Sequence, residues 1–532
     1  MNINAAFEEW AGILGQERIL SEADAQIVYG RCTTGERRRI LGAVRPRDCN
    51  ELPAIITVAN RRAVPLYAIS TGRNWGYGTA LPVDNGCVLM DLSELNRIVD
   101  FDSESGVVTL EPGVTQGMLA EFLDRGSHSY MVPVTGAGPS CSIIGNTLER
   151  GYGISPHSDH FGAVTALEAV LADGRVYRSA LSESNGGPLD RVFKWGIGPY
   201  VDGLFTQSGL GVVIRMSVVL ARLPESLKIF IFGLDGERDI LDIVPQVREV
   251  LVRYPGVVGG VKLMNSHQLL AMTAEYPDAV PEASKLITPE MLLRLRKKFR
   301  VPVWTGFGTL YGSKGVVAAA EREIHAVLRS PVKFVEFISP RRVESLSGLT
   351  SWLPSGLRAR FGASVETLNR SMELVGGRPN EMALALAYWL GGHAAAPGIP
   401  LDPARDGRGL IWYAPLVPMK ADCVADYLSL VEPILRDHEM EPLISLTSMS
   451  DRCFDSTIPL LFDASSDYDR NRAERCYWAL LEAGKDAGFL PYRVGIQTMR
   501  WLSAGGGTYW QVVREIKRAL DPNSILSPGR YV

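Results

Sequence analysis

The sequence predicts an α+β protein with two domains, and three features of the chain support this. The chain has 532 residues, whereas single hydrophobic cores stop growing beyond roughly 250–300 residues. Over the first 225 residues, segments typical of helices and of strands are mixed, and glycine-rich loops lie at the ends of two strands. The pattern changes after Pro224, which indicates a second α+β domain at roughly 226–490.

The elements predicted for the first domain follow from local patterns. Apolar residues at helical spacing predict helices at 51–60 and 116–123. Short apolar runs bounded by turn residues predict strands at 64–70, 87–92, 106–110 and 211–220. The runs 164–171 and 176–177 flank an Asp-Gly pair, which is typical of a hairpin.

The second domain and the tail contain longer amphipathic segments. A strand at 228–232 directly precedes the first of them. A loop rich in Pro, Gly and Asp, 397–409, precedes an apolar run at 410–416. The predicted helices cover 235–254, 313–328, 421–435, 472–487 and, in the tail, 510–520.

Composition and charge argue against several functional classes. The net charge of −4 gives no basic surplus for nucleic acid, and no apolar run reaches the length of a membrane span. The amino terminus lacks a basic region followed by an apolar stretch, so we expect no signal peptide and a cytoplasmic location. The seven cysteines form no C-x-x-C pair, so neither a disulfide framework nor a metal site is expected.

The first glycine-rich loop, 71–79, has the sequence T-G-R-N-W-G-Y-G-T. Glycines let backbone amides approach an anion closely, so Gly72, Gly76 and Gly78 are suited to holding a diphosphate. The spacing matches neither the P-loop nor the dinucleotide-binding G-x-G-x-x-G followed by a helix. The alternative interpretation is that these glycines only form turns.

The second glycine-rich stretch, 136–153, contains six glycines or prolines, four in its first ten residues and two at its end, with Asn146, Glu149 and Arg150 between them. Such a backbone is suited to packing tightly against a flat ring system. The alternative is an irregular loop without a ligand. Two such stretches in one domain favour a large nucleotide cofactor.

Four segments together resemble the FAD domain of the vanillyl-alcohol oxidase/p-cresol methylhydroxylase family. The two glycine-rich stretches are similar to its diphosphate loop and to its segment beside the isoalloxazine. The other two are G-P-Y-V-D-G-L-F-T-Q-S at 198–208 and D-P-N-S-I-L-S-P-G at 521–529. The resemblance is close over about 43–225 and 485–530. It implies an FAD domain built from 1–225 and 491–532, and a cap domain at 226–490 over the flavin.

The resemblance also implies which residues bind FAD. They lie in the two glycine-rich stretches, in one strand and in the tail: Thr71, Gly72, Arg73, Asn74, Trp75, Gly76, Pro139, Ser140, Ser142, Ile143, Gly145, Asn146, Glu149, Gly151, Val213 and Arg530. Relatives attach the flavin covalently to a histidine or tyrosine of the cap or to a histidine of the first loop. Here Leu410 stands at the aligned cap position, so we expect non-covalent FAD, with Tyr388 and His393 as the nearest alternatives.

Family members act on 4-substituted phenols, from which a benzylic hydride leaves to give a p-quinone methide. An ionised phenol lowers the barrier to hydride loss, and holding it requires a cation and hydroxyl donors. The resemblance assigns Tyr77, Tyr492 and Arg493 to the phenolate site, with Arg530 as a further cation. Asp455 is a candidate base on the cap side, although a structural aspartate fits the sequence as well.

The sequence also departs from the family pattern. A family tyrosine falls on Ile154, and the aspartate near flavin N5 falls near Ala137. The neighbouring His157, Asp159 and His160 are other possible bases, or braces of the loop.

Three functions therefore remain open. They are oxidation of a 4-alkylphenol or 4-hydroxybenzyl alcohol, oxidation of a non-phenolic alcohol, and a non-catalytic flavin-bearing or electron-transfer subunit. The expected partners are a small aromatic substrate, oxygen or an electron-transfer protein as acceptor, and a second copy of the chain. Neither nucleic acid nor a membrane is expected as a partner.

Overall fold

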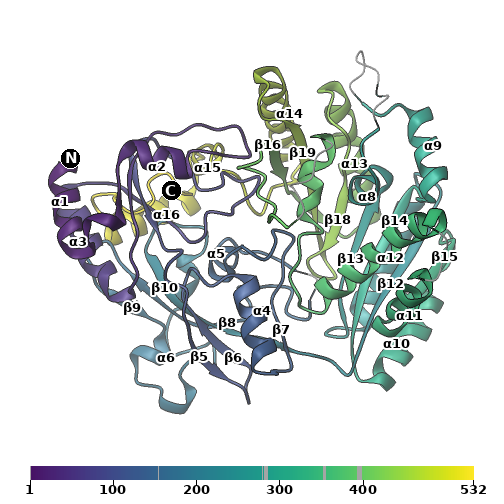
Figure 1. Ribbon diagram of the computed structural model, residues 1–532, viewed down its shortest axis with the longest axis horizontal. Coiled ribbons are helices and arrows are strands. Elements are labelled where there is room, and N and C mark those ends of the chain that lie inside the picture. Colours follow the sequence, from purple (N-terminus) through teal and green to yellow (C-terminus); the bar gives the residue numbers. More distant parts are fainter. Residues whose placement is uncertain are drawn as a thin grey trace.

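The strands on either side of residue 225 form separate sheets. The computed structural model describes residues 2–153, 155–277, 280, 286–351, 355–391 and 398–531. In this part of the chain, the strands before residue 225 form a mixed sheet, an antiparallel sheet and one short pair, and the strands after it form a further antiparallel sheet. Figure 1 shows the latter, flanked by helices, in the half of the molecule opposite to both chain termini.

The mixed sheet places the first glycine-rich loop. Its order is β1-β2-β4-β3, with β2, β4 and β3 parallel. Because parallel strands end at one edge, the loop after β3 starts at the edge where ligands bind in α/β sheets. The elements here are β1 (Ile19–Leu20), β2 (Ile40–Val44), β3 (Leu66–Ile69), β4 (Cys87–Asp91), α1 (Ile3–Leu14), α2 (Glu22–Tyr29) and α3 (Leu52–Arg62).

The antiparallel sheet of the first 225 residues has the order β5-β6-β10-β8-β9. It contains the hairpin predicted from the Asp-Gly pair, whose Gly174 has a φ of +86°. Helices α4 and α5 pack on the sheet through a shared apolar core. The elements are β5 (Ile98–Asp102), β6 (Val107–Leu110), β7 (Tyr130–Met131), β8 (Val164–Val170), β9 (Val176–Arg178), β10 (Val212–Val219), β11 (Ala221–Arg222), α4 (Gln116–Arg125), α5 (Ile143–Leu148) and α6 (Ala180–Glu183).

The sheet that follows residue 225 has the order β15-β12-β14-β13-β18-β19-β16, with β17 paired to β19. Its strands are β12 (Ser226–Leu234), β13 (Val258–Asn265), β14 (Trp304–Gly312), β15 (Phe334–Ile338), β16 (Arg408–Tyr413), β17 (Leu416–Pro418), β18 (Ser445–Ser448) and β19 (Cys453–Asp463). Its helices are α7 (Asp239–Arg253), α8 (Ser266–Thr273), α9 (Pro289–Phe299), α10 (Lys314–Val327), α11 (Pro340–Ser351), α12 (Ser355–Val375), α13 (Ala421–Asp437) and α14 (Asp467–Asp486).

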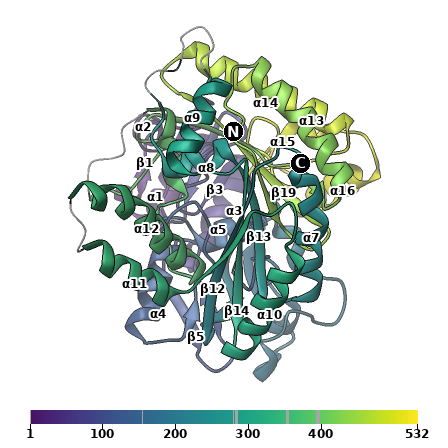
Figure 2. The same cartoon turned by 90° about the vertical axis from the view of Figure 1, so that its right-hand side faces the viewer.

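One face of this sheet is buried under helices, and the other face turns toward the first sheets. Helices α7, α10, α13 and α14 share a large apolar core with the first face, which includes Phe230 and Phe232 of β12. On the opposite face, Ile229 packs with residues that include Met372 and Val375 of α12. Figure 2 shows α7 and α10 on one side of β12 and β14, and α11 and α12 on the other. Alternation along each strand therefore leaves every second side chain free to face inward.

The carboxyl-terminal segment returns to the mixed sheet. It contains α15 (Met499–Ser503) and α16 (Thr508–Leu520). The Leu66 backbone N–H of β3 donates to the Ile525 carbonyl at 2.7 Å, and the Ser527 N–H donates to the Leu66 carbonyl at 2.7 Å. The buried Asp521 carboxylate accepts from the Ile525 and Leu526 amides and pairs with Lys517. We propose that 491–532 completes a first domain formed by 1–225, with 226–490 as the second.

The structure confirms most of the predicted elements and corrects two. Helix α14 begins at Asp467, not at 472, because the Ser466 side chain caps it and two aspartates occupy its first turn. The second glycine-rich stretch is not wholly irregular, since α5 lies within it. The Ser142 hydroxyl caps this helix by accepting from the Gly145 amide at 2.9 Å. No helix in the described part of the chain combines the length and apolar character needed to span a membrane.

Candidate active site

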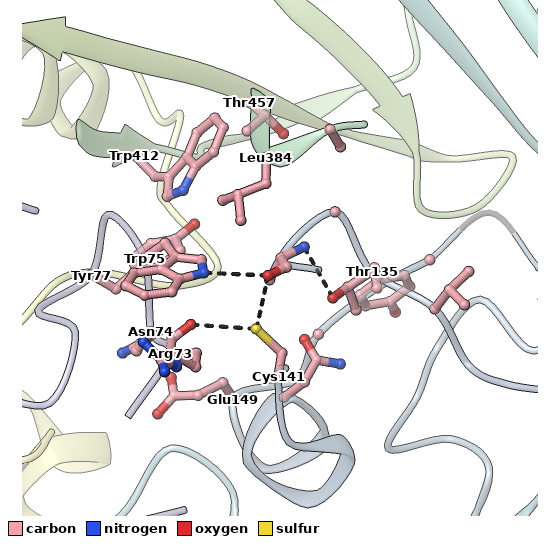
Figure 3. Close-up of a pocket in the computed structure, with 18 of the residues that line it drawn as sticks. Arg73, Asn74, Trp75, Tyr77, Thr135, Cys141, Glu149, Leu384, Trp412 and Thr457 are labelled. Carbon is pink, nitrogen blue, oxygen red and sulfur yellow. Dashed lines mark hydrogen bonds between the residues drawn. The ribbon is translucent and has the colours of Figure 1, made fainter. Parts of the chain in front are cut away.

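A cavity of about 1300 Å³ lies between the first glycine-rich loop, the α5 stretch and the inward face of the sheet formed after residue 225. Pockets for drug-sized ligands are commonly about 300–1,000 Å³, so this cavity is large enough for a dinucleotide and a small substrate. Figure 3 shows residues of the first loop on one side, with side chains of the second sheet and its connections opposite. The residues of the first loop are Arg73, Asn74, Trp75 and Tyr77, and the side chains opposite are Leu384, Trp412 and Thr457.

The first loop presents backbone donors to this cavity. Thr71, Gly72, Arg73, Asn74 and Trp75 all line it. The backbone N–H groups of Thr71, Gly72 and Arg73 donate no hydrogen bond to any residue that the structure describes. Gly72 has a φ of +65°, which turns the chain so that successive amides point to one side. Buried amides require acceptors, and a diphosphate would supply them.

Gly76 has a different role, because it does not line the cavity. A Cβ atom at this position would lie 2.2 Å from Cδ1 of Trp412 in β16. The Trp412 N–H donates to the Gly76 carbonyl at 3.2 Å, and the Gly76 N–H donates to the Thr33 hydroxyl at 2.8 Å. The glycine therefore allows the loop to pack directly on the opposite sheet.

The α5 stretch forms a second wall. Ser142, Gly145, Asn146, Glu149 and Gly151 line the cavity, as does Val213 of β10. Two hydrogen bonds hold the segment before α5 against the first loop: Trp75 Nε1 donates to the Ala137 carbonyl at 3.3 Å, and Cys141 Sγ donates to the Arg73 carbonyl at 3.7 Å (Figure 3). Pro139, Ser140 and Ile143 do not line the cavity, and Ile143 is buried in the apolar core.

Three charged side chains meet at the inner end of this wall. The buried Glu149 carboxylate forms ion pairs with Arg530 of the tail and with Arg493, whose Nε lies 3.3 Å from Oε2. Arg530 also donates to the Tyr67 hydroxyl at 3.0 Å. Two guanidinium groups and one carboxylate leave a net charge of +1, so this cluster is suited to an additional anion.

Tyr77, Tyr492 and Arg493, which the resemblance assigns to a phenolate site, lie together at the cavity. The Arg493 guanidinium stacks 4.3 Å from the ring centroid of Tyr77. Burial raises the pKa of Tyr77 well above its usual value; Tyr492 and Asp455 add to this, while Arg493 opposes it. Burial and Asp455 likewise raise the pKa of Tyr492. Both hydroxyls therefore stay protonated at neutral pH and can donate hydrogen bonds to an oxyanion.

Asp455 of β19 lines the cavity from the opposite side. Its Oδ2 accepts from the Thr457 hydroxyl at 3.1 Å, while its buried Oδ1 has no hydrogen-bond partner among the described residues. Burial raises the pKa of Asp455 to about 7, and both the Thr457 hydrogen bond and the charge of Lys262 oppose this rise. A carboxyl group with that pKa can exchange a proton near neutral pH.

Comparisons with known proteins agree with this geometry. A model for the FAD binding domain matches residues 40–180. The chain is 34% identical over 531 residues to the 1'-carboxy-chondrochloren decarboxylase of Chondromyces crocatus, covering 99% of this chain and 96% of the relative. It is 26% identical over 532 residues to the flavoprotein subunit of 4-cresol dehydrogenase (hydroxylating) from Pseudomonas putida, covering 99% and 95%. The chain belongs to the vanillyl-alcohol oxidase/p-cresol methylhydroxylase family.

Two solved structures have the same fold. One is p-cresol methylhydroxylase with substrate bound, with a TM-score of 0.84, 24% identity, and coverage of 99% of this chain and 96% of that chain. The other is 4-ethylphenol oxidase from Gulosibacter chungangensis in complex with isoeugenol, with a TM-score of 0.88, 23% identity, and coverage of 99% and 97%. The protein is thus an FAD-dependent oxidoreductase with the fold of this family. The donors of the first loop fit the FAD diphosphate.

The residues at which this chain departs from the family pattern lie in different surroundings. Ala137 is held through its carbonyl in the wall of the cavity. The His160 Nδ1 lies 2.6 Å from Nδ2 of Asn146, and the Asp159 carboxylate accepts from the Gly162 amide, so both brace the loop. Burial lowers the pKa of His157, but this residue does not line the cavity. Ile154 and His393 lie outside the described residues.

The structure also bears on where a covalent flavin link would form. Leu410 lines the cavity at the start of β16, and no histidine in the described part of the chain does so. The Tyr388 hydroxyl donates to Asp406 at 2.6 Å and accepts from the Asp402 amide at 3.0 Å. Non-covalent binding stays a prediction.

Sequence reasoning missed Lys262 of β13, which lines the cavity together with Asp455. The available signal was a charged residue within an otherwise apolar and small-residue strand, V-G-G-V-K-L-M-N. It carried no weight because β13 itself was not predicted.

Proposed function

We propose that the protein oxidises 4-substituted phenols, of the 4-alkylphenol or 4-hydroxybenzyl alcohol type, by removing a hydride from the benzylic carbon to give a p-quinone methide. The observation that carries this proposal is the cluster of Tyr77, Tyr492 and Arg493 in one cavity, where Arg493 also belongs to the group of Glu149, Arg493 and Arg530 with a net charge of +1. An oxyanion buried here has two hydroxyl donors and a guanidinium as partners. Non-phenolic alcohols have no oxyanion that needs this arrangement.

The residues of this chain would act on the phenol and not on the bond that breaks. Tyr77 and Tyr492 would donate hydrogen bonds to the phenolate oxygen, and Arg493 would balance its charge. The electrons of the phenolate then support loss of hydride at the para substituent. Bound FAD supplies the two-electron acceptor for that hydride. The apolar lining, which includes Trp412 and Leu384, limits access of water.

The test is anaerobic reduction of the flavin by matched pairs of substrates. We expect 4-ethylphenol and 4-hydroxybenzyl alcohol to bleach the oxidised flavin absorbance, and benzyl alcohol and a sugar lactone precursor to leave it unchanged. Reduction by the non-phenolic alcohols alone would contradict the proposal. The acceptor of the electrons, oxygen or an electron-transfer protein, follows from adding each to the reduced enzyme.

Asp455 should act as the base that accepts the phenol proton, and this gives a pH dependence. The carboxyl group is protonated below its pKa of about 7, so it can accept a proton only as the pH rises through that value. We expect kcat/KM to increase from pH 5.5 to 8 with an apparent pKa near that of Asp455. The Asp455→Asn variant should lose this increase and be slower at pH 8.

Thr457→Val provides the matched control for the Asp455 prediction. Removing its hydroxyl takes away a hydrogen bond that lowers the pKa of Asp455, so the rise in kcat/KM should move to higher pH. If Asp455→Asn keeps the full wild-type pH profile, another group is the base.

Oxidative decarboxylation is a second candidate function, supported by the similarity to a protein named a decarboxylase. Hydride loss from a 3-(4-hydroxyphenyl)propanoate leaves a p-quinone methide next to the carbon that bears the carboxylate. The bond between this carbon and the carboxylate carbon then breaks, and its electrons move into the quinone methide, which releases CO2 and a 4-vinylphenolate. With the carboxyl carbon labelled, release of labelled CO2 in proportion to flavin reduction would support this candidate, and a hydroxylated acid as product would exclude it.

We further propose that FAD is held without a covalent bond. No described histidine lines the cavity, so the isolated protein should release yellow FAD into the supernatant when it is precipitated with acid. A fluorescent flavin band that stays with the protein on a denaturing gel would contradict this. FMN should not replace FAD, because it lacks the diphosphate that the Thr71–Arg73 amides are suited to hold.

A further inference from the structure

Three cavity-facing residues form a row across the neighbouring strands β19, β18 and β13. Asp455 of β19 lies opposite Thr447 of β18, and Thr447 lies in register with Lys262 of β13. Residues in register on neighbouring strands share one face of the sheet, and all three line the cavity. The row therefore runs from Asp455, which acts on the pKa of Tyr77 and Tyr492, toward Lys262.

Lys262 has no counter-ion in the part of the chain that the structure describes. Among the residues that the structure describes, none forms a hydrogen bond or an ion pair with its side chain. The described lining contains two carboxylates, Glu149 and Asp455. Glu149 is already paired with two arginines, and Asp455 lies beyond ion-pair distance of Lys262. Burial lowers the pKa of Lys262, and Asp455 opposes this.

Lys262 is half-buried and lines the cavity, where an anion bound beside its ammonium group would stabilise the charge. Of the side chains on the same face, Phe307 and Met264 are apolar, and Thr447, in register on β18, carries a hydroxyl but no charge. No described side chain neutralises the ammonium group, so an anionic ligand in the cavity would supply the missing counter-charge and favour the protonated form of Lys262.

We propose that Lys262 binds a carboxylate carried on the para chain of the substrate, so that the preferred substrates are 4-hydroxyphenyl acids. This rests on the proposed oxidation of phenols and names the substrate class of the same site. The lengths agree. Lys262 lies two strands from Asp455, or about 10 Å at the usual strand spacing. In 3-(4-hydroxyphenyl)propanoate, the phenol oxygen and the carboxylate are roughly 9 Å apart by ordinary bond lengths.

The same contact would hold a carboxylate on the carbon next to the benzylic carbon. In that position it becomes a leaving group once the p-quinone methide has formed. Lys262 thus connects phenol oxidation with oxidative decarboxylation. It selects substrates that carry a carboxylate, and the position of the carboxylate on the para chain decides whether CO2 can leave.

The test compares 3-(4-hydroxyphenyl)propanoate with its neutral carboxamide. Wild type, Lys262→Met, Lys262→Arg and the control Lys298→Met are each loaded with FAD and checked for flavin content. Lys298 also lines the cavity but lies exposed on α9. Dissociation constants are measured by calorimetry, and rates by anaerobic flavin reduction. Each variant is judged by the ratio of its dissociation constants for the acid and the amide, because an effect of Lys262 on the pKa of Asp455 acts on the phenol group that both compounds share.

We expect wild type and Lys298→Met to favour the acid at least tenfold, in line with a charge-assisted hydrogen bond. Lys262→Met should remove that preference while the amide binds within about threefold of wild type, and Lys262→Arg should keep part of it. A wild type without preference, an unchanged preference in Lys262→Met, or its loss in Lys298→Met would each overturn the assignment. If neither compound reduces the flavin, the proposed phenol oxidation fails, while the calorimetric ratio still decides the role of Lys262.

Discussion

The Glu149→Gln variant should unfold with a free energy lower by roughly 3–5 kcal/mol, the usual cost of removing one partner of a buried ion pair. Glu149 is buried between Arg493 and Arg530, and without its charge two guanidinium groups would face each other with no carboxylate between them. The tail should also bind less firmly, because Arg530 connects it to α5. Urea unfolding followed by circular dichroism, together with the temperature at which FAD is released, measures both effects.

Glu168→Gln is the control for this experiment. Glu168 of β8 pairs with Arg215 at 3.1 Å but is more exposed and does not line the cavity. A pair of this kind contributes about 0–1 kcal/mol, and its loss should leave FAD binding intact. Equal effects of the two substitutions would mean that the Glu149 cluster has no special role in holding the cofactor site.

Replacing Arg493 with alanine should weaken the binding of a phenolic ligand by roughly ten- to a hundredfold, because a charge-assisted hydrogen bond contributes about 1.5–3 kcal/mol. Arg493→Lys should give an intermediate loss, since lysine keeps the charge but not the planar group that stacks on Tyr77. Phenols bound to wild type should show a phenolate band in difference spectra, and this band should weaken in both variants.

The control for the Arg493 prediction is a second ligand and not a second protein variant. The O-methyl ether of the same phenol cannot ionise, so its binding should change little in Arg493→Ala. Tyr77→Phe, which removes one hydroxyl donor, should likewise affect the phenol more than the ether. If the ether binds wild type and reduces its flavin as well as the phenol does, the phenolate model is wrong and oxidation of a non-phenolic alcohol replaces it.

Local patterns were sufficient for much of the fold. The Asp-Gly hairpin of β8 and β9, the helices α4 and α13, and α10, which Ser313 caps, all lie where spacing and turn chemistry place them. The strands β13, β18 and β19 were not predicted. β13 pairs with β18, which lies far along the chain, so its stability comes from cross-strand packing and not from local preference. β18 and β19 are neighbours in the chain and pair as a hairpin.

The site divides in the same way. Tyr77, Tyr492 and Arg493 were predicted because each lies in a short sequence motif that can be recognised from a few neighbouring residues. The pairing of Glu149 with both Arg493 and Arg530 could not be inferred, because the three residues come from three distant segments and meet only when the tail pairs with β3. Gly76 was expected to hold the cofactor, whereas its close neighbour is Trp412.

By itself, the sequence determined the cofactor and the family, since these depend on contiguous motifs that can be recognised along the chain, and the same resemblance proposed the residues of a phenol site. Tertiary structure alone decided the charge balance of the site, the pKa of Asp455 and the place of Lys262. The physical reason is that burial and cross-strand register set these properties. Both arise only when strands separated by up to about two hundred residues pair into one sheet, as β13 and β18 do.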